Sequence, residues 1–200
     1  MTPLLVLIAA YLTGGVPFGY LLVRLKTGRD VRALGSGNIG ATNVLRTTGR
    51  AIAVVTLLLD IAKGWFAVWL AARFTDNSPV WMSAAAVVVM LGHAFPVWLG
   101  FKGGKAVASF IGAFLYLTPA PLLASLLVFV IVVAASRYIS LGSILAAGAF
   151  PFAVWLILHP ETPILWAAFI AGGFVVFRHR ANLGRIRDGN EHVFRFGAPK

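Results

Sequence analysis

The sequence contains no cysteine and little charge. A disulfide framework and a thiol nucleophile are therefore excluded. Only 12% of the residues are charged, about half of what is usual in a soluble domain. Six residues are Asp or Glu, and no cluster of these with histidine has the spacing of metal ligands. We therefore expect neither a metal ion nor another cofactor.

Apolar residues are abundant instead, at 60% of the chain with a mean hydropathy of +0.89. Runs near 20 residues recur, which indicates a helical protein that crosses a membrane several times. The runs cover residues 4–23, 51–72, 80–99, 106–135, 141–158 and 164–177. Glycines and Pro17 interrupt the first run, which predicts a kinked helix. The run 106–135 is broken at Thr118-Pro119-Ala120-Pro121.

The net charge of +11, and the positions of the Lys and Arg residues that produce it, predict the topology. In a membrane protein the positive-inside rule explains this excess, so no nucleic-acid partner is expected. If run 106–135 is a hairpin of two short spans, all of the 17 Lys and Arg residues face the cytoplasm except Arg73 and Lys63, which lies within a span. A single helix would divide them evenly. The sequence thus predicts an all-α polytopic protein with seven transmembrane helices, an external N-terminus and a cytoplasmic C-terminus.

One domain, residues 1–200, then presents three polar segments at its cytoplasmic face, which are residues 24–50, 92–106 and 178–200. The first contains a stretch of glycines, hydroxyls and amides that ends at Arg46. Successive glycine amides and a guanidinium suit a phosphate, although a solvated loop would have a similar composition. Lys105 follows Gly103 and Gly104 in the second segment, and Arg185 lies in the third. We expect these three cations, with the amides of Gly37, Gly103 and Gly104, to bind phosphate.

Asp60 and Lys63 are three residues apart within a span, so they share a helix face. They form either a structural ion pair or, if Lys63 faces a cavity, the floor of an anion pocket. His93 lies in another apolar run, as a hydrogen-bonded core residue or a functional one. His179 and Asn182 are also three apart, on the helix that leaves the last run.

Three signatures in this order resemble the bacterial PlsY family of acyl-phosphate:glycerol-3-phosphate acyltransferases. The first is Ser36-Gly-Asn38-Ile-Gly40-Ala-Thr42-Asn43-x-x-Arg46. The second is Gly92-His93-x-Phe95-Pro96 followed by Phe101-x-Gly103-Gly104-Lys105-x-Val107-Ala108. The third is Arg178-His179-x-x-Asn182-Leu183-x-Arg185-Ile186-x-x-Gly189-x-Glu191.

The resemblance implies a seven-helix enzyme of the bacterial inner membrane with a cytoplasmic active site. It implies transfer of a fatty acyl group from acyl phosphate to the 1-hydroxyl of glycerol 3-phosphate, which gives lysophosphatidic acid and phosphate in the first acylation of phospholipid synthesis. It also implies supply of acyl phosphate by the soluble enzyme PlsX, with which contact is expected. The His-x4-Asp device of many glycerolipid acyltransferases that use thioester donors is absent from the sequence.

On this basis we expect catalytic roles for one set of residues and substrate binding by another. The catalytic set is Ser36, Arg46, Lys105, His179 and Asn182, and the binding set is Gly37, Asn38, Thr42, Asn43, Lys63, His93, Gly103, Gly104, Arg185 and Glu191. The general base stays open between His179, His93 and a phosphate oxygen of a bound substrate. The alternative functions are a permease for an anionic phospho-compound and a scaffold without chemistry. Polar residues that cluster at one face disfavour the permease.

Overall fold

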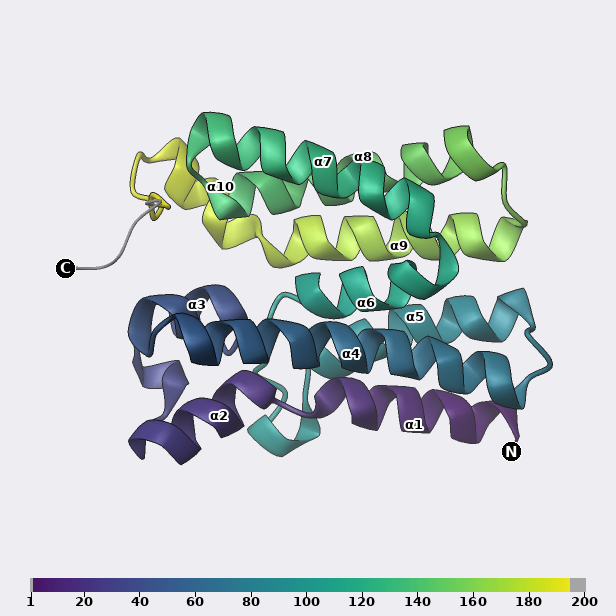
Figure 1. Ribbon diagram of the computed structural model, residues 1–200, viewed down its shortest axis with the longest axis horizontal. Helices are drawn as coiled ribbons and strands as arrows, with labels where there is room; N and C mark the ends of the chain where they lie inside the picture. The colour runs from purple at the N-terminus through teal and green to yellow at the C-terminus, as the bar shows by residue number, and fades with distance from the viewer. Residues whose placement is uncertain (1, 195–200) are drawn as a thin grey trace. The chain divides into compact units, whose positions relative to one another are not determined.

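The computed structural model describes residues 2–194, which form helices joined by turns and contain no strand. The last six residues of the predicted polar segment 178–200 lie outside the described residues. The chain divides into two compact units, Met1–Leu117 and Thr118–Lys200. Figure 1 shows the helices of each unit.

Unit 1 has six α-helices and two 3-10 turns. They are α1 (Pro3–Gly15), α2 (Phe18–Thr27), η1 (Val31–Ala33), α3 (Ala41–Thr47), α4 (Arg50–Phe74), α5 (Pro79–Ala94), η2 (Val97–Leu99) and α6 (Val107–Leu117). The first apolar run is broken between α1 and α2, as predicted. Val16 leaves the helix with extended backbone angles, and Pro17 has no N–H with which to continue it.

Small residues bring the helices of unit 1 into close contact. Where α1 packs on α5, a Cβ on Gly14 would overlap the Val89 carbonyl, and one on Gly92 would overlap the Tyr11 carbonyl. Close backbone approach of this kind is typical of helices packed in a membrane. Within this unit, the start of α1 and the α4–α5 turn lie at one end, and α2 and α3 lie at the other (Figure 1).

Unit 2 contains α7 (Pro119–Ser136), α8 (Ile139–Leu158), α9 (Thr162–Arg178) and α10 (Arg180–Arg187). Helix α8 packs against both α7 and α9. The chain bends by 50° between α9 and α10, so His179 stands at a corner and not on the continuous helix expected from the sequence. The Phe194 N–H donates to the Arg137 carbonyl over 2.7 Å, which keeps Phe194 beside the α7–α8 junction.

The described residues make an all-helical integral membrane protein. Five helical segments are long and apolar enough to cross a membrane, and a sixth is obtained if the bent pair α9–α10 counts as one span. Helix α6 is apolar but has only 11 residues. The break predicted at Thr118 is confirmed, because Thr118 separates α6 from α7. Of the two short spans expected here, only α6 is short, because α7 has 18 residues.

Candidate active site

The buried side chain of Asn43 organises the loop between α2 and α3. Its Oδ1 accepts a hydrogen bond from the Ser36 N–H over 2.9 Å. Its Nδ2 contacts the carbonyl oxygens of Asn38, Leu34 and Val31 at 2.8, 3.0 and 3.3 Å. A single amide thus satisfies backbone groups spread over a loop that has no regular ladder. The sequence analysis placed Asn43 among the substrate-binding residues, and in this structure its polar atoms bond to the chain.

The same loop presents the other residues of the first signature. Ser36 and Arg46 are exposed, and Thr42 lies half-buried in the first turn of α3. The Asn38 Oδ1 accepts from the Gly40 N–H over 2.8 Å. The Gly37 N–H donates to the Leu34 carbonyl over 3.0 Å, so it has a partner within the chain, whereas we expected it to face a phosphate.

An ion pair at the start of this loop was missed by the sequence analysis. The Asp30 carboxylate lies 2.7 Å from the Arg32 guanidinium and also accepts from the Arg32 N–H. The side-chain hydrogen bond from Arg32 lowers the pKa of Asp30 despite the opposing effect of burial. The guanidinium lies over the Tyr20 ring, 5.2 Å from its centroid. The i, i+2 spacing of Asp and Arg was the only available signal.

The second signature forms a tight turn with unusual backbone angles. Phe101 and Ala106 have φ of 62° and 61°, a region that costs a residue with a side chain about 1–3 kcal/mol. The Gly103 and Gly104 N–H groups donate to the carbonyls of Ala94 and His93, each over 3.1 Å. Both amides thus hold the loop against the end of α5, and a role for Gly103 and Gly104 in phosphate binding stays a prediction. Lys105, the next residue, is half-buried.

Three titratable side chains meet in the interior of unit 1. The Lys63 Nζ lies 2.7 Å from the Asp60 carboxylate and donates to the Val16 carbonyl over 2.8 Å. The His93 Nδ1 lies 3.7 Å from the same carboxylate. Lys63 is only 4% exposed. Of the two interpretations of Asp60 and Lys63, the structure favours the ion pair.

In unit 2, His179 is buried at the corner between α9 and α10. Its Nδ1 lies 2.8 Å from the Val175 carbonyl oxygen. A carbonyl can only accept a hydrogen bond, so Nδ1 carries the proton, and in the neutral ring Nε2 carries the lone pair. This is the tautomer that a histidine needs to act as a base through Nε2.

A buried carboxylate holds the rest of the third signature together. Glu191 accepts hydrogen bonds from the Ser140 Oγ at 3.0 Å, the Asn182 Nδ2 at 2.8 Å and the Arg185 Nε at 2.8 Å. Burial raises the pKa of Glu191, but the bonds from Asn182, Ser140 and Arg185 together outweigh it and the pKa is lowered. Ser140 was missed by the sequence analysis, because it lies 51 residues from Glu191. Through these hydrogen bonds Glu191 orients the side chains of Asn182 and Arg185.

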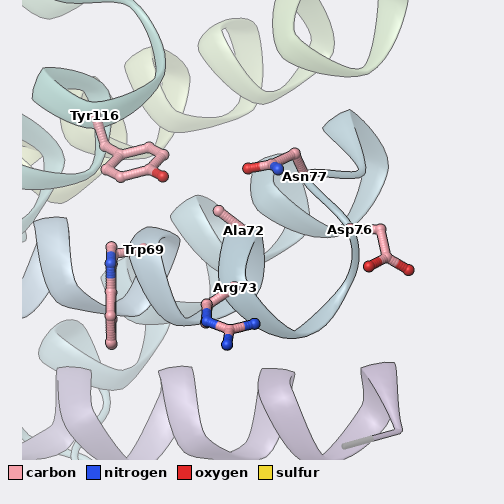
Figure 2. A pocket seen from close by; sticks show the side chains of 6 residues that line it. All are labelled: Trp69, Ala72, Arg73, Asp76, Asn77 and Tyr116. Carbon is pink, nitrogen blue, oxygen red and sulfur yellow. The ribbon is translucent and has the colours of Figure 1, made fainter.

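Two depressions stand out among the described residues of unit 1. An apolar groove of about 420 Å³ adjoins the break between α1 and α2, and Val16, Pro17, Tyr20, Leu21, Trp98 and Leu99 line it. A cavity of about 210 Å³ lies near the α4–α5 turn, where Trp69, Ala72, Arg73, Asp76, Asn77 and Tyr116 surround it (Figure 2). The groove is suited to a hydrocarbon chain, and through Trp98 and Leu99 it adjoins the segment that carries the second signature.

The predicted site residues thus fall into two groups. Unit 1 carries Ser36, Gly37, Asn38, Thr42, Asn43, Arg46, Lys63, His93, Gly103, Gly104 and Lys105. Unit 2 carries His179, Asn182, Arg185 and Glu191. Within residues 2–194, no three His, Asp or Glu side chains gather as a metal ion would require.

Comparison with known proteins gives one consistent result. Residues 4–189 match the family described as glycerol-3-phosphate acyltransferase. A glycerol-3-phosphate acyltransferase of Desulforamulus reducens is 43% identical over 100% of this chain and 98% of its own. One of Geotalea daltonii is 45% identical over 96% of this chain and 97% of its own.

Two solved structures are also similar. The crystal structure of PlsY (YgiH), an integral membrane glycerol 3-phosphate acyltransferase, in its glycerol 3-phosphate form has a TM-score of 0.91 at 36% identity. It covers 98% of this chain and 96% of that chain. The lysophosphatidic acid form of PlsY gives a TM-score of 0.88 at 35% identity with the same coverage.

Proposed function

This chain belongs to the glycerol-3-phosphate acyltransferase family of PlsY, and from that premise we propose that its acyl donor is an acyl phosphate. The enzyme transfers the acyl group to the 1-hydroxyl of glycerol 3-phosphate and releases lysophosphatidic acid and phosphate. The proposal agrees with the sequence, which lacks both a thiol nucleophile and the His-x4-Asp device. An acyl phosphate is already activated, so the hydroxyl can attack its carbonyl directly without a covalent enzyme intermediate.

The observation that carries the proposal is the arrangement around His179. Its Nδ1 donates to the Val175 carbonyl, so Nε2 can accept the proton of the attacking hydroxyl. As the new ester bond forms, the bond between the acyl carbon and the phosphate oxygen breaks, and phosphate leaves with the electron pair. A phosphate oxygen of a bound substrate is the alternative acceptor for the proton. His93 is less suited, because its ring lies between Asp60 and Gly104 in the interior.

Both substrates carry a phosphate, so the site needs cations. We assign this role to Arg46 and Lys105 in unit 1 and to Arg185 in unit 2, whose guanidinium Glu191 orients. Ser36 and Thr42 add hydroxyl donors, and Asn38 and Asn43 shape the loop that holds them. Asn182 lies in α10, three residues after His179. It completes the proposed catalytic set. The apolar groove beside Val16 and Trp98 is suited to the acyl chain.

We further propose that both units form one domain, because each carries only part of the required chemistry. Counting α6 and α9 as short spans gives seven transmembrane helices with an external N-terminus and a cytoplasmic C-terminus. The site then faces the cytoplasm of a bacterium from its inner membrane, where soluble PlsX can deliver acyl phosphate. Neither a metal ion nor another cofactor takes part in the proposed reaction.

A permease for an anionic phospho-compound is the alternative, since a basic vestibule would use the same cations. The two are separated by purified protein in detergent with palmitoyl phosphate, glycerol 3-phosphate and excess chelator. We expect equal amounts of phosphate and lysophosphatidic acid to form. Turnover with acyl-CoA but not acyl phosphate, or strict dependence on magnesium, would refute the proposed donor and mechanism.

A further inference from the structure

A buried cluster of Asp60, Lys63 and His93 connects two irregular parts of unit 1. Asp60 and Lys63 lie on α4, and His93 lies in the last turn of α5. Their side chains are 3–4% exposed. The Asp60 carboxylate is the centre of the cluster, with the Lys63 Nζ at 2.7 Å and the His93 Nδ1 at 3.7 Å. The chemistry proposed above does not use this carboxylate.

One end of the cluster supports the break in the first span. Val16 follows the last residue of α1, and Pro17 cannot donate a hydrogen bond to continue the helix. Carbonyls at a helix end need donors from elsewhere, above all at membrane depth. The Lys63 Nζ supplies one to the Val16 carbonyl over 2.8 Å. The ammonium thereby fixes the break relative to α4.

The other end supports the glycine loop that leads to Lys105. The Gly104 N–H donates to the His93 carbonyl over 3.1 Å. A Cβ on Gly104 would overlap the His93 Nε2, so the imidazole fills the space where any other residue would place its side chain. The ring therefore sets how deep the loop sits, and Lys105 is the next residue along it.

Stability alone does not account for an ion pair in this position. Replacing a buried ion pair with apolar side chains of similar size is often neutral or even stabilising, whereas removing one partner is costly. Charges within a membrane span carry a further cost. A cluster that adds little net stability but contacts two irregular backbone segments is well placed to fix their geometry.

We propose that Asp60, Lys63 and His93 are positioning residues that set the place of Gly104 and Lys105 at the substrate phosphate. The inference rests on the proposed function in one respect, which is that Lys105 contacts a phosphate. Asp60 lies 3.7 Å from the imidazole, Lys63 neutralises the carboxylate and bonds to the Val16 carbonyl, and His93 supports the loop.

The test is the charge-free double variant Asp60→Leu/Lys63→Met, which removes the cluster's charges and leaves neither partner alone. We expect it to fold, with a Tm lowered by the loss of the Lys63 hydrogen bond to the Val16 carbonyl. We expect its kcat/KM to fall about 10²-fold, as misplacement by about 1 Å does in other enzymes. Asp60→Asn/Lys63→Met returns a polar group of similar shape beside His93 and should recover part of the loss. The matched control is Arg73→Met/Asp76→Asn, two exposed residues on the same chain, which should be as active as the wild type.

A double-mutant cycle with Lys105→Ala distinguishes positioning from general damage. If the cluster acts through Lys105, adding Asp60→Leu/Lys63→Met to Lys105→Ala should cost far less than it costs alone. Wild-type kcat/KM in the folded charge-free variant, or full additivity in the cycle, would overturn the proposal. If that variant does not fold, Gly104→Ala replaces it, with Gly173→Ala as the control because a Cβ at Gly173 meets no atom within 4 Å. Wild-type kcat/KM in folded Gly104→Ala would also overturn the proposal.

Failure of this inference can be told from failure of the proposed donor. The wild-type enzyme is first assayed with palmitoyl phosphate and, in parallel, with palmitoyl-CoA. If only the thioester is used, the donor assignment is wrong, and the same variants are then compared with that donor. If acyl phosphate is used and the variants behave as the wild type, only the positioning proposal is wrong.

Discussion

The two ends of each unit carry polar residues of the same types, but these residues are buried at one end and exposed at the other. In unit 1, Asn43 is buried within α3, whereas Asn77 is exposed at the α4–α5 turn. In unit 2, His179 and Glu191 are buried near α10, whereas His159 and Glu161 are exposed at the α8–α9 turn. Figure 2 shows the exposed end of unit 1, with Arg73, Asp76 and Asn77 around an open cavity.

This difference in burial indicates which polar residues have positions fixed by the fold. Burying a polar group is costly unless it finds a partner. At the α3 and α10 ends, Asn43 and Glu191 each form hydrogen bonds to several groups. These bonds fix the positions of the neighbouring residues. Residues at the opposite ends serve as ordinary turn residues. Each exposed residue is therefore a control for its buried counterpart.

The largest effect is expected at His179. If it is the general base, His179→Ala should lower kcat/KM about 10²–10⁴-fold and remove the acid limb of the pH–rate profile. The control is His159→Asn, since Asn tolerates the φ of 45° at that position, and it should leave the rate unchanged. A His179→Gln variant that keeps both the rate and the limb would assign the proton to a substrate phosphate.

The second-largest effect is expected from substitution of Asn43. Asn43→Ala leaves the Ser36 N–H and the carbonyls of Leu34 and Asn38 without the partner they have now. We expect a loss of about 1–3 kcal/mol in stability and, because the loop shifts, about 10²-fold in kcat/KM. Asn77→Gly, which suits the φ of 55° there, should change neither. Equal effects of the two variants would remove the distinction between the ends of unit 1.

Arg46 should show a smaller but clear effect. A lysine ammonium cannot reproduce the bidentate geometry of a guanidinium on phosphate. Arg46→Lys should therefore cost about 10-fold in kcat/KM, in line with one charge-assisted contact. The loss should appear in kcat if Arg46 holds the leaving phosphate, and in KM if it captures glycerol 3-phosphate. Arg73→Lys is the control, and normal kinetics of Arg46→Lys would place the phosphate elsewhere.

The smallest effect concerns stability and pH. The pKa of Glu191 lies below its ordinary value of 4.5, so its stabilising contribution is present above that value and is lost as the pH falls through the lowered pKa. Glu191→Gln should lower Tm by roughly 2–4 °C at pH 7, which corresponds to about 1 kcal/mol. The gap to the wild type should shrink below pH 4.5. A pH-independent gap, or the same effect in Glu161→Gln, would contradict this role.

The sequence predicted the features that depend on local chemistry. Pro17 and Thr118 mark the two breaks in apolar runs, and both are confirmed. The ion pair of Asp60 and Lys63 follows from helical spacing. The third signature pointed to His179, Asn182 and Glu191, but it did not predict the bend of 50° at His179.

The features that the sequence could not predict depend on distant partners. The bond from Ser140 to Glu191 joins residues 51 positions apart, and no spacing rule covers it. The amides of Gly37, Gly103 and Gly104 were expected to face phosphate, because glycine-rich loops often do so. Each instead bonds to a backbone carbonyl of its own unit. Only the folded chain shows that a Cβ at Gly103 or Gly104 would overlap His93, and that Gly37 has a φ of 71°.

The proposal with the widest consequences is the topology, in which the α2–α3 loop of unit 1 and the residues after α10 in unit 2 each lie on the cytoplasmic side. Because the chain has no cysteine, single cysteines can be labelled with an impermeant maleimide in right-side-out and inverted vesicles. We predict that Ser36→Cys, Arg137→Cys and Asn190→Cys react from the cytoplasmic side, and that Asn77→Cys and Glu161→Cys react from the opposite side. Reaction of Asn190→Cys from the same side as Asn77→Cys would contradict the proposed topology.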